Sequence, residues 1–144
     1  MSDNLQGFRE LSRKLQELGS LEGGKILKSG CTLAGTPVVR RARTLIPVGA
    51  DAHRTYKGRM VAPGFAKRSI AKVAVLGRTR SIAWCMISVR PEAWYAVHFV
   101  ELGTSKQPKQ PWLVPAFRQT QQEQIERLGA TIRRKILTVA AKRS

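Results

Sequence analysis

Apolar residues recur at helical spacing near the start of the chain. Phe8, Leu11, Leu15 and Leu18 are separated by three, four and three residues, which predicts an amphipathic helix over residues 4–19. The Gly-Ser pair at the end of this stripe is typical of a helix C-terminus.

A second helix is expected over residues 21–45. Pro37 lies inside this stretch, and because proline lacks a backbone N–H it predicts a kink or break there. The apolar residues on one side of the expected helix are Leu27, Cys31, Ala34, Val38, Ala42 and Leu45.

Alternating apolar residues predict two strands, over residues 69–77 and 81–90, joined by a short turn at 78–80. Pro91 and Glu92 then lead into a third apolar run, residues 93–101, which we interpret as a further strand. Short connections between these runs favour an antiparallel sheet.

The last helix is expected over residues 113–141, from the spacing of Ile125, Leu128, Ile132, Ile136 and Val139. The pattern therefore predicts a single α+β domain over residues 1–144. This domain has two N-terminal helices, a three- to four-stranded antiparallel sheet and a long C-terminal helix packed on it.

Residues 46–69 show little periodicity and contain glycines, prolines and basic residues. We expect a long basic loop that becomes ordered against a partner. Tyr56 and Phe65 are its candidate interface residues.

The chain carries 26 Lys and Arg against nine Asp and Glu, a net charge of +17. This imbalance indicates a negatively charged partner, either nucleic acid or acidic protein neighbours. Protein neighbours are favoured, because the basic residues do not gather on one predicted element. The candidate basic surface residues are Arg54, Lys57, Arg59, Lys67, Arg68, Arg133, Arg134 and Lys135.

Catalytic and cofactor chemistry has little support. The two cysteines, Cys31 and Cys85, lack CxxC spacing and are interpreted as buried free thiols of a chain made in a reducing cytoplasm. His53 and His98 have no partner set that defines a nucleophile, a metal site or a cofactor site. No apolar run is long enough for a membrane span. We therefore predict a protein that is not an enzyme and has no cofactor and no membrane partner.

The segment 95–116 is the most specific part of the chain. Gly103 favours a turn with positive φ, and the prolines at 108 and 111 stiffen the backbone that follows. Pro115 fits the first turn of a helix. Glu101 is interpreted as a carboxylate that caps its own loop or as an ion-pair partner between subunits.

The three tryptophans have different expected roles. Trp84 and Trp94 fall in predicted strands, where core packing is favoured over stacking on nucleic-acid bases. Trp112, flanked by prolines and followed by Leu113, is the candidate interface anchor. The alternative is that Trp112 packs under the C-terminal helix of its own subunit.

The same segment resembles a family, the small tail-completion (neck) proteins of lambdoid, Hong Kong 97-type long-tailed phages. Leu102 stands where the family has an aromatic residue, and Val114 where it has Arg. The loop after residue 48 also differs, with Gly-Ala-Asp in place of the usual Ala-Pro-Val-Asp-Thr-Gly. Nine positions match at fixed spacing: Glu101, Gly103, Thr104, Pro108, Pro111, Trp112, Leu113, Pro115 and Ala116. Weaker similarity covers residues 8–11 and 42–48.

This resemblance implies a structural virion protein that assembles in the host cytoplasm and forms a ring at the head–tail joint. Its implied partners are further copies of the chain, neighbouring neck and tail proteins, and viral DNA in the channel. The alternative is a sequence-independent nucleic-acid-binding protein. A small hydrolase has only His53 and Glu101 in its favour.

Overall fold

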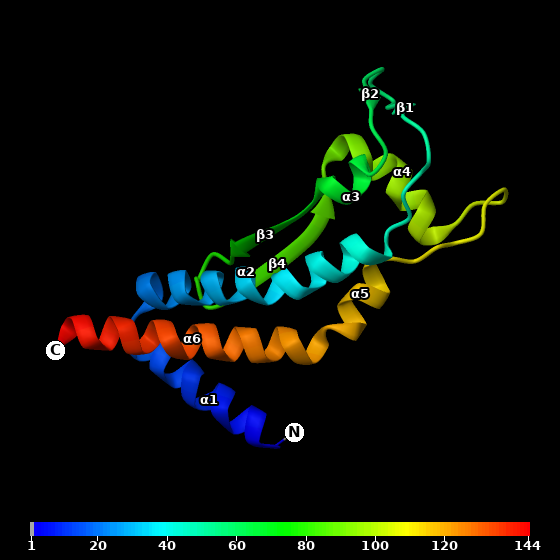
Figure 1. Cartoon of the computed structure of the whole chain (residues 1–144). Coiled ribbons are helices and arrows are strands. Elements are labelled where there is room, and N and C mark those ends of the chain that lie inside the picture. The colour runs from blue at the N-terminus through cyan, green and yellow to red at the C-terminus, as the bar shows by residue number, and fades with distance from the viewer. Residues whose placement is uncertain (1) are drawn as a thin grey trace. The chain divides into compact units, whose positions relative to one another are not determined.

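The computed structural model describes residues 2–144, with side chains for residues 5–19 and 21–144 (Figure 1). Within these residues the chain forms six helices and four strands, and the predicted α+β class is confirmed. The elements are α1 (Ser2–Glu17), α2 (Ser20–Leu45), β1 (His53–Arg54), β2 (Met60–Val61), α3 (Phe65–Ser69), β3 (Ile70–Leu76), β4 (Ala83–Val89), α4 (Pro91–Leu102), α5 (Leu113–Gln119) and α6 (Gln121–Arg143). No helix among the described residues is long and apolar enough to cross a membrane.

The chain divides into two compact units. The first unit contains α1, α2 up to Thr36, the hairpin segment Val73–Met86 and the C-terminal segment Gln122–Ser144. The second unit contains Pro37–Lys72 and Ile87–Gln121. Each unit has its own buried cluster of apolar side chains.

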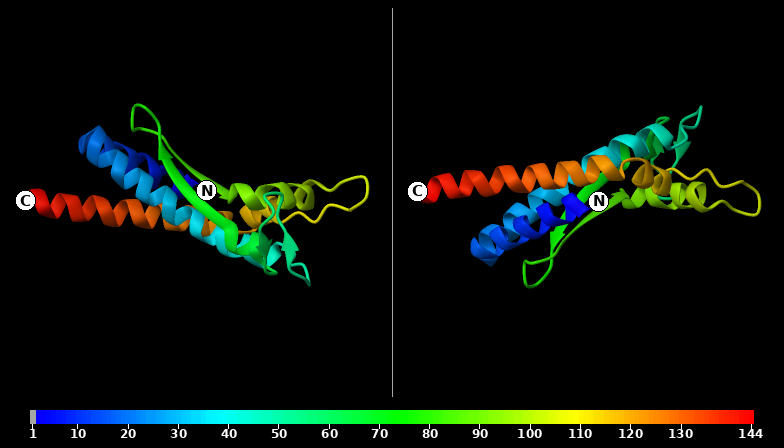
Figure 2. Two further views of the ribbon diagram at one scale, coloured as in Figure 1. Left: turned by 90° about the horizontal axis from the view of Figure 1, so that it is seen from above. Right: turned by 90° about the horizontal axis from the view of Figure 1, so that it is seen from below.

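In the first unit, α1, the N-terminal part of α2 and α6 lie side by side (Figure 2). Two glycines of α2 permit this close packing. A Cβ at Gly23 would lie 2.7 Å from the carbonyl oxygen of Leu15, and one at Gly30 would lie 3.0 Å from Cγ1 of Ile132. The core of this unit consists of Leu11, Ile26, Ile132 and Ile136.

Strands β3 and β4 form an antiparallel hairpin. The Gly77 N–H donates to the Ile82 carbonyl at 2.8 Å. At the other end of the hairpin, the Arg90 N–H donates to the Ser69 carbonyl at 3.2 Å. These two bonds place Val73 opposite Met86 and Val75 opposite Trp84. The predicted turn at 78–80 is present, with Arg80 at a φ of 57°.

The core of the second unit gathers residues from five elements. Its fully buried side chains include Pro37 and Val38 of α2 and Ile70 of β3. The cluster consists of Val38, Val39, Ala42, Ile46, Ile70, Val89, Ala93, Val97, Trp112 and Ala116.

The segment 46–69 is not a continuous loop. It forms the short antiparallel pair β1–β2, with His53 opposite Val61, followed by helix α3. Val61 and Ser69 are buried, which ties the segment to the core of the second unit.

The expected third strand over residues 93–101 is wrong, because this segment is helix α4. Its apolar residues surround the helix, and an apolar run of this kind fits a strand and a buried helix equally well. The flanking residues give the correct reading. Pro91 occupies the first turn, and the Gly103 N–H closes the helix on the Phe99 carbonyl at 2.8 Å.

Two further boundaries differ from the prediction. Helix α2 runs unbroken through Pro37, where burial of Pro37 and Val38 stabilises a helical turn that proline alone disfavours. The expected C-terminal helix is divided into α5 and α6 at Thr120. The Thr120 hydroxyl donates to the Ala116 carbonyl at 2.7 Å, so it bonds the backbone where the helix is interrupted.

Candidate functional site

The nine residues on which the predicted resemblance rests lie at the end of α4, in the loop after it and at the start of α5. The Glu101 carboxylate accepts the backbone N–H groups of Trp112 at 2.6 Å, Leu113 at 3.0 Å and Val114 at 3.2 Å. These donors lie at the N-terminus of α5, where backbone N–H groups have no acceptor inside the helix. Glu101 therefore caps α5, as one of its two predicted roles requires, and its negative charge suits a helix N-terminus.

The loop between Glu101 and Trp112 turns back on itself. Gly103 has a φ of 77°, and a Cβ there would lie 2.8 Å from the Lys109 nitrogen, so only glycine fits without strain. The Thr104 N–H donates to the Gln107 carbonyl at 2.9 Å, and the Thr104 hydroxyl accepts the Gln107 N–H at 3.1 Å. Residues 101–116 thus form a folded helix–loop–helix connection.

Trp112 lies in the core of the second unit, with only 3% of its surface exposed. This burial contradicts the expectation that its side chain anchors an interface and supports the alternative of a core residue. The physical reason is that Glu101 holds the Trp112 backbone at the start of α5, and the ring packs inward beside Ala116. Leu113 is half-buried against the same cluster.

The indole N–H of Trp112 is buried and has no acceptor among the described residues. A buried donor without an acceptor costs about 1–3 kcal/mol. The ring therefore contributes to the core through its size and not through a polar contact.

Tyr56 and Phe65 line one cavity of about 390 Å³ in the second unit, together with Arg54. Glu92 of α4 also lines this cavity; its carboxylate accepts a hydrogen bond from the Thr55 hydroxyl at 2.8 Å and pairs with Arg59 at 3.6 Å. The structure thus places Tyr56 and Phe65, the two candidate interface residues of segment 46–69, around one cavity. Thr55 and Arg59 join the same segment to Glu92 of α4.

Three arginines line a second hollow in this unit, of about 370 Å³. Arg59 directly precedes β2, Arg68 belongs to α3, and Arg90 directly follows β4. Arg68 is held by a hydrogen bond to the Pro63 carbonyl at 3.0 Å, and the Arg59 guanidinium lies over the Phe65 ring. Such a group of guanidinium side chains suits an anionic partner.

The second unit carries far more basic than acidic residues. The second unit holds thirteen Lys and Arg but only Asp51, Glu92 and Glu101 as acids, and residues 52–91 contain no acid at all. Arg54, Lys57, Arg59, Lys67 and Arg68 fall in this acid-free segment. The other candidates, Arg133, Arg134 and Lys135, lie on α6 in the first unit. The structure therefore does not bring all eight together in one unit.

Both faces of the β3–β4 hairpin are apolar. Ala74 is buried, and Cys31 of α2 donates a weak hydrogen bond to the Ala83 carbonyl at 3.8 Å, so one face packs on α2. The opposite face is exposed and consists of Val73, Val75, Ile82, Trp84 and Met86. We refer to these five residues as the hairpin face.

A second exposed apolar surface lies on α4. Trp94 stacks on His98 with ring centroids 4.8 Å apart, and Tyr95 meets Phe99 edge-on at 5.0 Å. We refer to Trp94, Tyr95, Phe99 and Leu102 as the α4 face; all four side chains are exposed. The helix contains no Lys or Arg.

These surfaces correct the prediction that Trp84 and Trp94 are core residues, because they expose 52% and 51% of their surfaces. Sequence reasoning missed both faces because it assumed that apolar residues point inward. A usable signal was present: β3 and β4 lack the polar alternation of a strand with one solvated face, and α4 is apolar all round.

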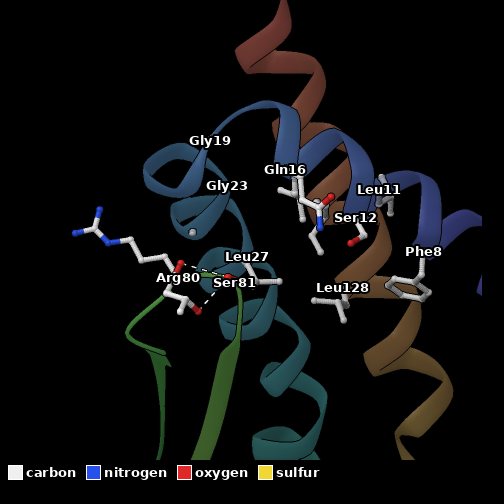
Figure 3. A pocket seen from close by; sticks show the side chains of 14 residues that line it. Phe8, Leu11, Ser12, Gln16, Gly19, Gly23, Leu27, Arg80, Ser81 and Leu128 are labelled. Atoms are coloured by element: carbon white, nitrogen blue, oxygen red, sulfur yellow. Dashed lines mark hydrogen bonds between the residues drawn. The ribbon is translucent and has the colours of Figure 1, made fainter.

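The first unit contains a cavity of about 380 Å³ between α1, α2, α6 and the hairpin turn (Figure 3). Phe8, Leu11, Leu27 and Leu128 surround the space, whereas the Arg80 guanidinium points away from it. The lining is thus mainly apolar and carries no charged group that could fix a ligand's orientation.

Among the side chains that the structure describes (residues 5–19 and 21–144), no group of three or more His, Cys, Asp and Glu could hold a metal ion. Burial raises the pKa of the Cys31 thiol, with a smaller contribution from the Cys85 thiol. Both cysteine side chains are partly buried. Comparison with family models, curated proteins and solved structures finds no match to this chain.

Proposed function

We propose that the chain is a structural component of the head–tail joint of a long-tailed phage, where copies assemble as a ring and contact neighbouring neck and tail proteins. The observation that carries this proposal is the match to the tail-completion motif from Glu101 to Ala116. Within it, Glu101 accepts the Trp112 N–H, Gly103 provides the positive φ of the turn, and the Thr104 hydroxyl accepts the Gln107 N–H, all in the α4–α5 connection. Residues that depend on one another in this way are expected to be retained together.

The proposed mechanism is interface formation without turnover. A ring requires a heterologous interface, in which two different patches of each subunit meet. The hairpin face in the first unit and the α4 face in the second unit are two such patches. Exposed apolar patches of this kind mark protein–protein contacts.

The proposal is tested by deleting the gene from the phage genome that encodes it and examining lysates by electron microscopy. We expect DNA-filled heads and separate or defective tails, with joining restored when the intact gene is supplied from a plasmid. Normal, infectious virions without the protein would overturn the proposal.

A second candidate function is sequence-independent nucleic-acid binding. The specific observation in its favour is the acid-free segment 52–91, with Arg59, Arg68 and Arg90 around one hollow. Binding to random duplex DNA should then weaken about ten- to a thousandfold between low and physiological salt.

The matched variants for this test are the pairs Arg59→Ala with Arg68→Ala and Arg133→Ala with Arg134→Ala. Each pair removes two charges, and each lost phosphate contact lowers the salt slope by about one. If the hollow binds DNA, only the first pair lowers the slope by about two. Equal effects of both pairs would indicate attraction by net charge alone, and weak binding at low salt would exclude the function.

A further inference from the structure

The hairpin face is unusual for a sheet surface. In an antiparallel sheet with one face on the core, the other face is normally polar. Here Val73 lies opposite Met86 and Val75 opposite Trp84, and all four are exposed. Between Val73 and Met86 the only charged residues are Arg78 and Arg80 in the turn. The face is therefore apolar with a cationic end.

The α4 face has complementary properties. Ala93 and Val97 are buried on one side of the helix. The side chains of the α4 face, on the other side, are exposed. In a chain with net charge +17, this helix of twelve residues has no cation and includes Glu92 and Glu101. Glu92 pairs with Arg59 and Glu101 caps α5, so both acids are engaged within the subunit. Arg78 and Arg80 of another copy would still meet no Lys or Arg on the helix itself, which limits repulsion.

We propose that the hairpin face of one copy packs against the α4 face of the next copy. The contact is heterologous and rests on the proposed ring, because repeated contacts of this kind close a ring or extend a filament. A contact between two hairpin faces would bring together surfaces that both carry Arg78 and Arg80 and no acid. The absence of Lys and Arg from α4 therefore favours the α4 face over a second hairpin face as the occupant.

The test uses two single substitutions that add the same charge. Met86→Lys places a cation in the hairpin face, and Phe99→Lys places one in the α4 face. Leu137→Lys is the matched control, because Leu137 is an exposed apolar residue of α6 outside both faces. Mass is measured by light scattering during size-exclusion chromatography, and folding is checked by circular dichroism.

We expect the full-length protein and the Leu137→Lys control to self-associate. Each face variant alone should associate at least about tenfold more weakly. The decisive sample is the mixture of both face variants. Met86→Lys retains an intact α4 face and Phe99→Lys an intact hairpin face, so the mixture should form one-to-one dimers but no closed ring.

Several outcomes would overturn the contact. A mixture that stays monomeric while the unaltered protein assembles would point to a different interface, and so would face variants that assemble normally. A strictly monomeric unaltered protein at high concentration would also refute it. If one substitution unfolds the chain, Val73→Lys and Leu102→Lys provide the second pair, with the same expected results.

This test can fail separately from the proposed function. Rings that form through other faces would leave a role at the head–tail joint in place and remove only this contact. Conversely, dimers restored in the mixture together with normal virions after gene deletion would support the contact and exclude the role.

Discussion

The side chain of Glu101 and the backbone of Trp112 are joined by a 2.6 Å hydrogen bond across eleven positions of sequence. The bond fixes where α5 begins relative to the end of α4, and it leaves the Trp112 ring in the core of the second unit. An acidic residue at the end of one helix thus takes the place of an N-cap on the next, since the Trp112 side chain makes no cap hydrogen bond.

Removing this carboxylate should destabilise the second unit. Glu101→Ala leaves three N–H groups of α5 without their acceptor and is expected to lower the unfolding free energy by about 2 kcal/mol. Glu101→Gln keeps one acceptor oxygen and should lose about half as much. Urea unfolding measures both. The control Glu17→Ala removes an exposed ion pair with Arg13 and should change stability by less than about 0.5 kcal/mol; an equal loss in the control would contradict the capping role.

Trp112 offers a pair of substitutions with different expected costs. Trp112→Ala removes a large buried ring and should cost about 3–5 kcal/mol. Trp112→Phe keeps an aromatic ring and removes the N–H that has no acceptor among the described residues, so its cost should stay below about 1.5 kcal/mol. Thermal melts of the isolated chain compare the two. A stable Trp112→Ala monomer that fails only in assembly would restore the role of interface anchor.

Two glycine-to-alanine changes should have opposite signs. At Gly23 the new methyl group would lie 2.7 Å from the Leu15 carbonyl oxygen, so α1 and α2 must separate, at about 1–3 kcal/mol. At Gly7, inside α1, nothing lies within 4 Å of the new methyl group, and alanine should stabilise the helix by about 0.5–1 kcal/mol. Denaturant midpoints of the two variants provide the comparison, and destabilisation by both would argue against the close helix contact.

The Cys31 thiol gives a prediction for pH. Burial raises its pKa above the ordinary value of 9.0, so the folded state keeps the proton to higher pH than the unfolded state. Its contribution to stability is complete below pH 9 and is lost as the pH rises through the higher folded pKa. Between pH 8 and 10, Cys31→Ala should therefore lose less stability in urea unfolding than the unaltered chain. A steeper loss in the variant would contradict the direction of the shift.

The segment 46–69 is still expected to become better protected on assembly. Its strands are only two residues long, and Thr55 and Arg59 hold it to Glu92. Hydrogen exchange of the isolated chain should show fast exchange here relative to α6, and slower exchange after partner proteins are added. Strong protection in the isolated chain would refute this expectation.

The elements with a clear period could be predicted from the sequence. The stripe from Phe8 to Leu18 gave α1, and the alternating runs on either side of the 78–80 turn gave β3 and β4. Helix α4 could not be predicted from periodicity, because apolar residues occupy both its buried and its exposed sides. Pro91 and Gly103 carried the missing information.

The candidate site was predicted only in part. Glu101 had two predicted roles, a cap on its own loop or an ion pair between subunits, and in the structure its carboxylate accepts the N–H groups at the start of α5. The apolar pattern of the hairpin and of α4 signals that both sides of each element are apolar, but it does not tell which side is covered, so the exposure of Trp84 and Trp94 was not predicted. That information depends on which elements pack against the hairpin and against α4.

The absence of acids between residues 52 and 91 has a consequence for titration. This segment has no carboxylate of its own whose protonation could change its binding in acid. A partner that binds it through carboxylates contributes groups that become protonated below about pH 5, whereas diester phosphates do not. The acid limb of the binding curve would therefore report the chemistry of the partner, and a midpoint near 4 would distinguish carboxylates from the diester phosphates of DNA, which remain ionised.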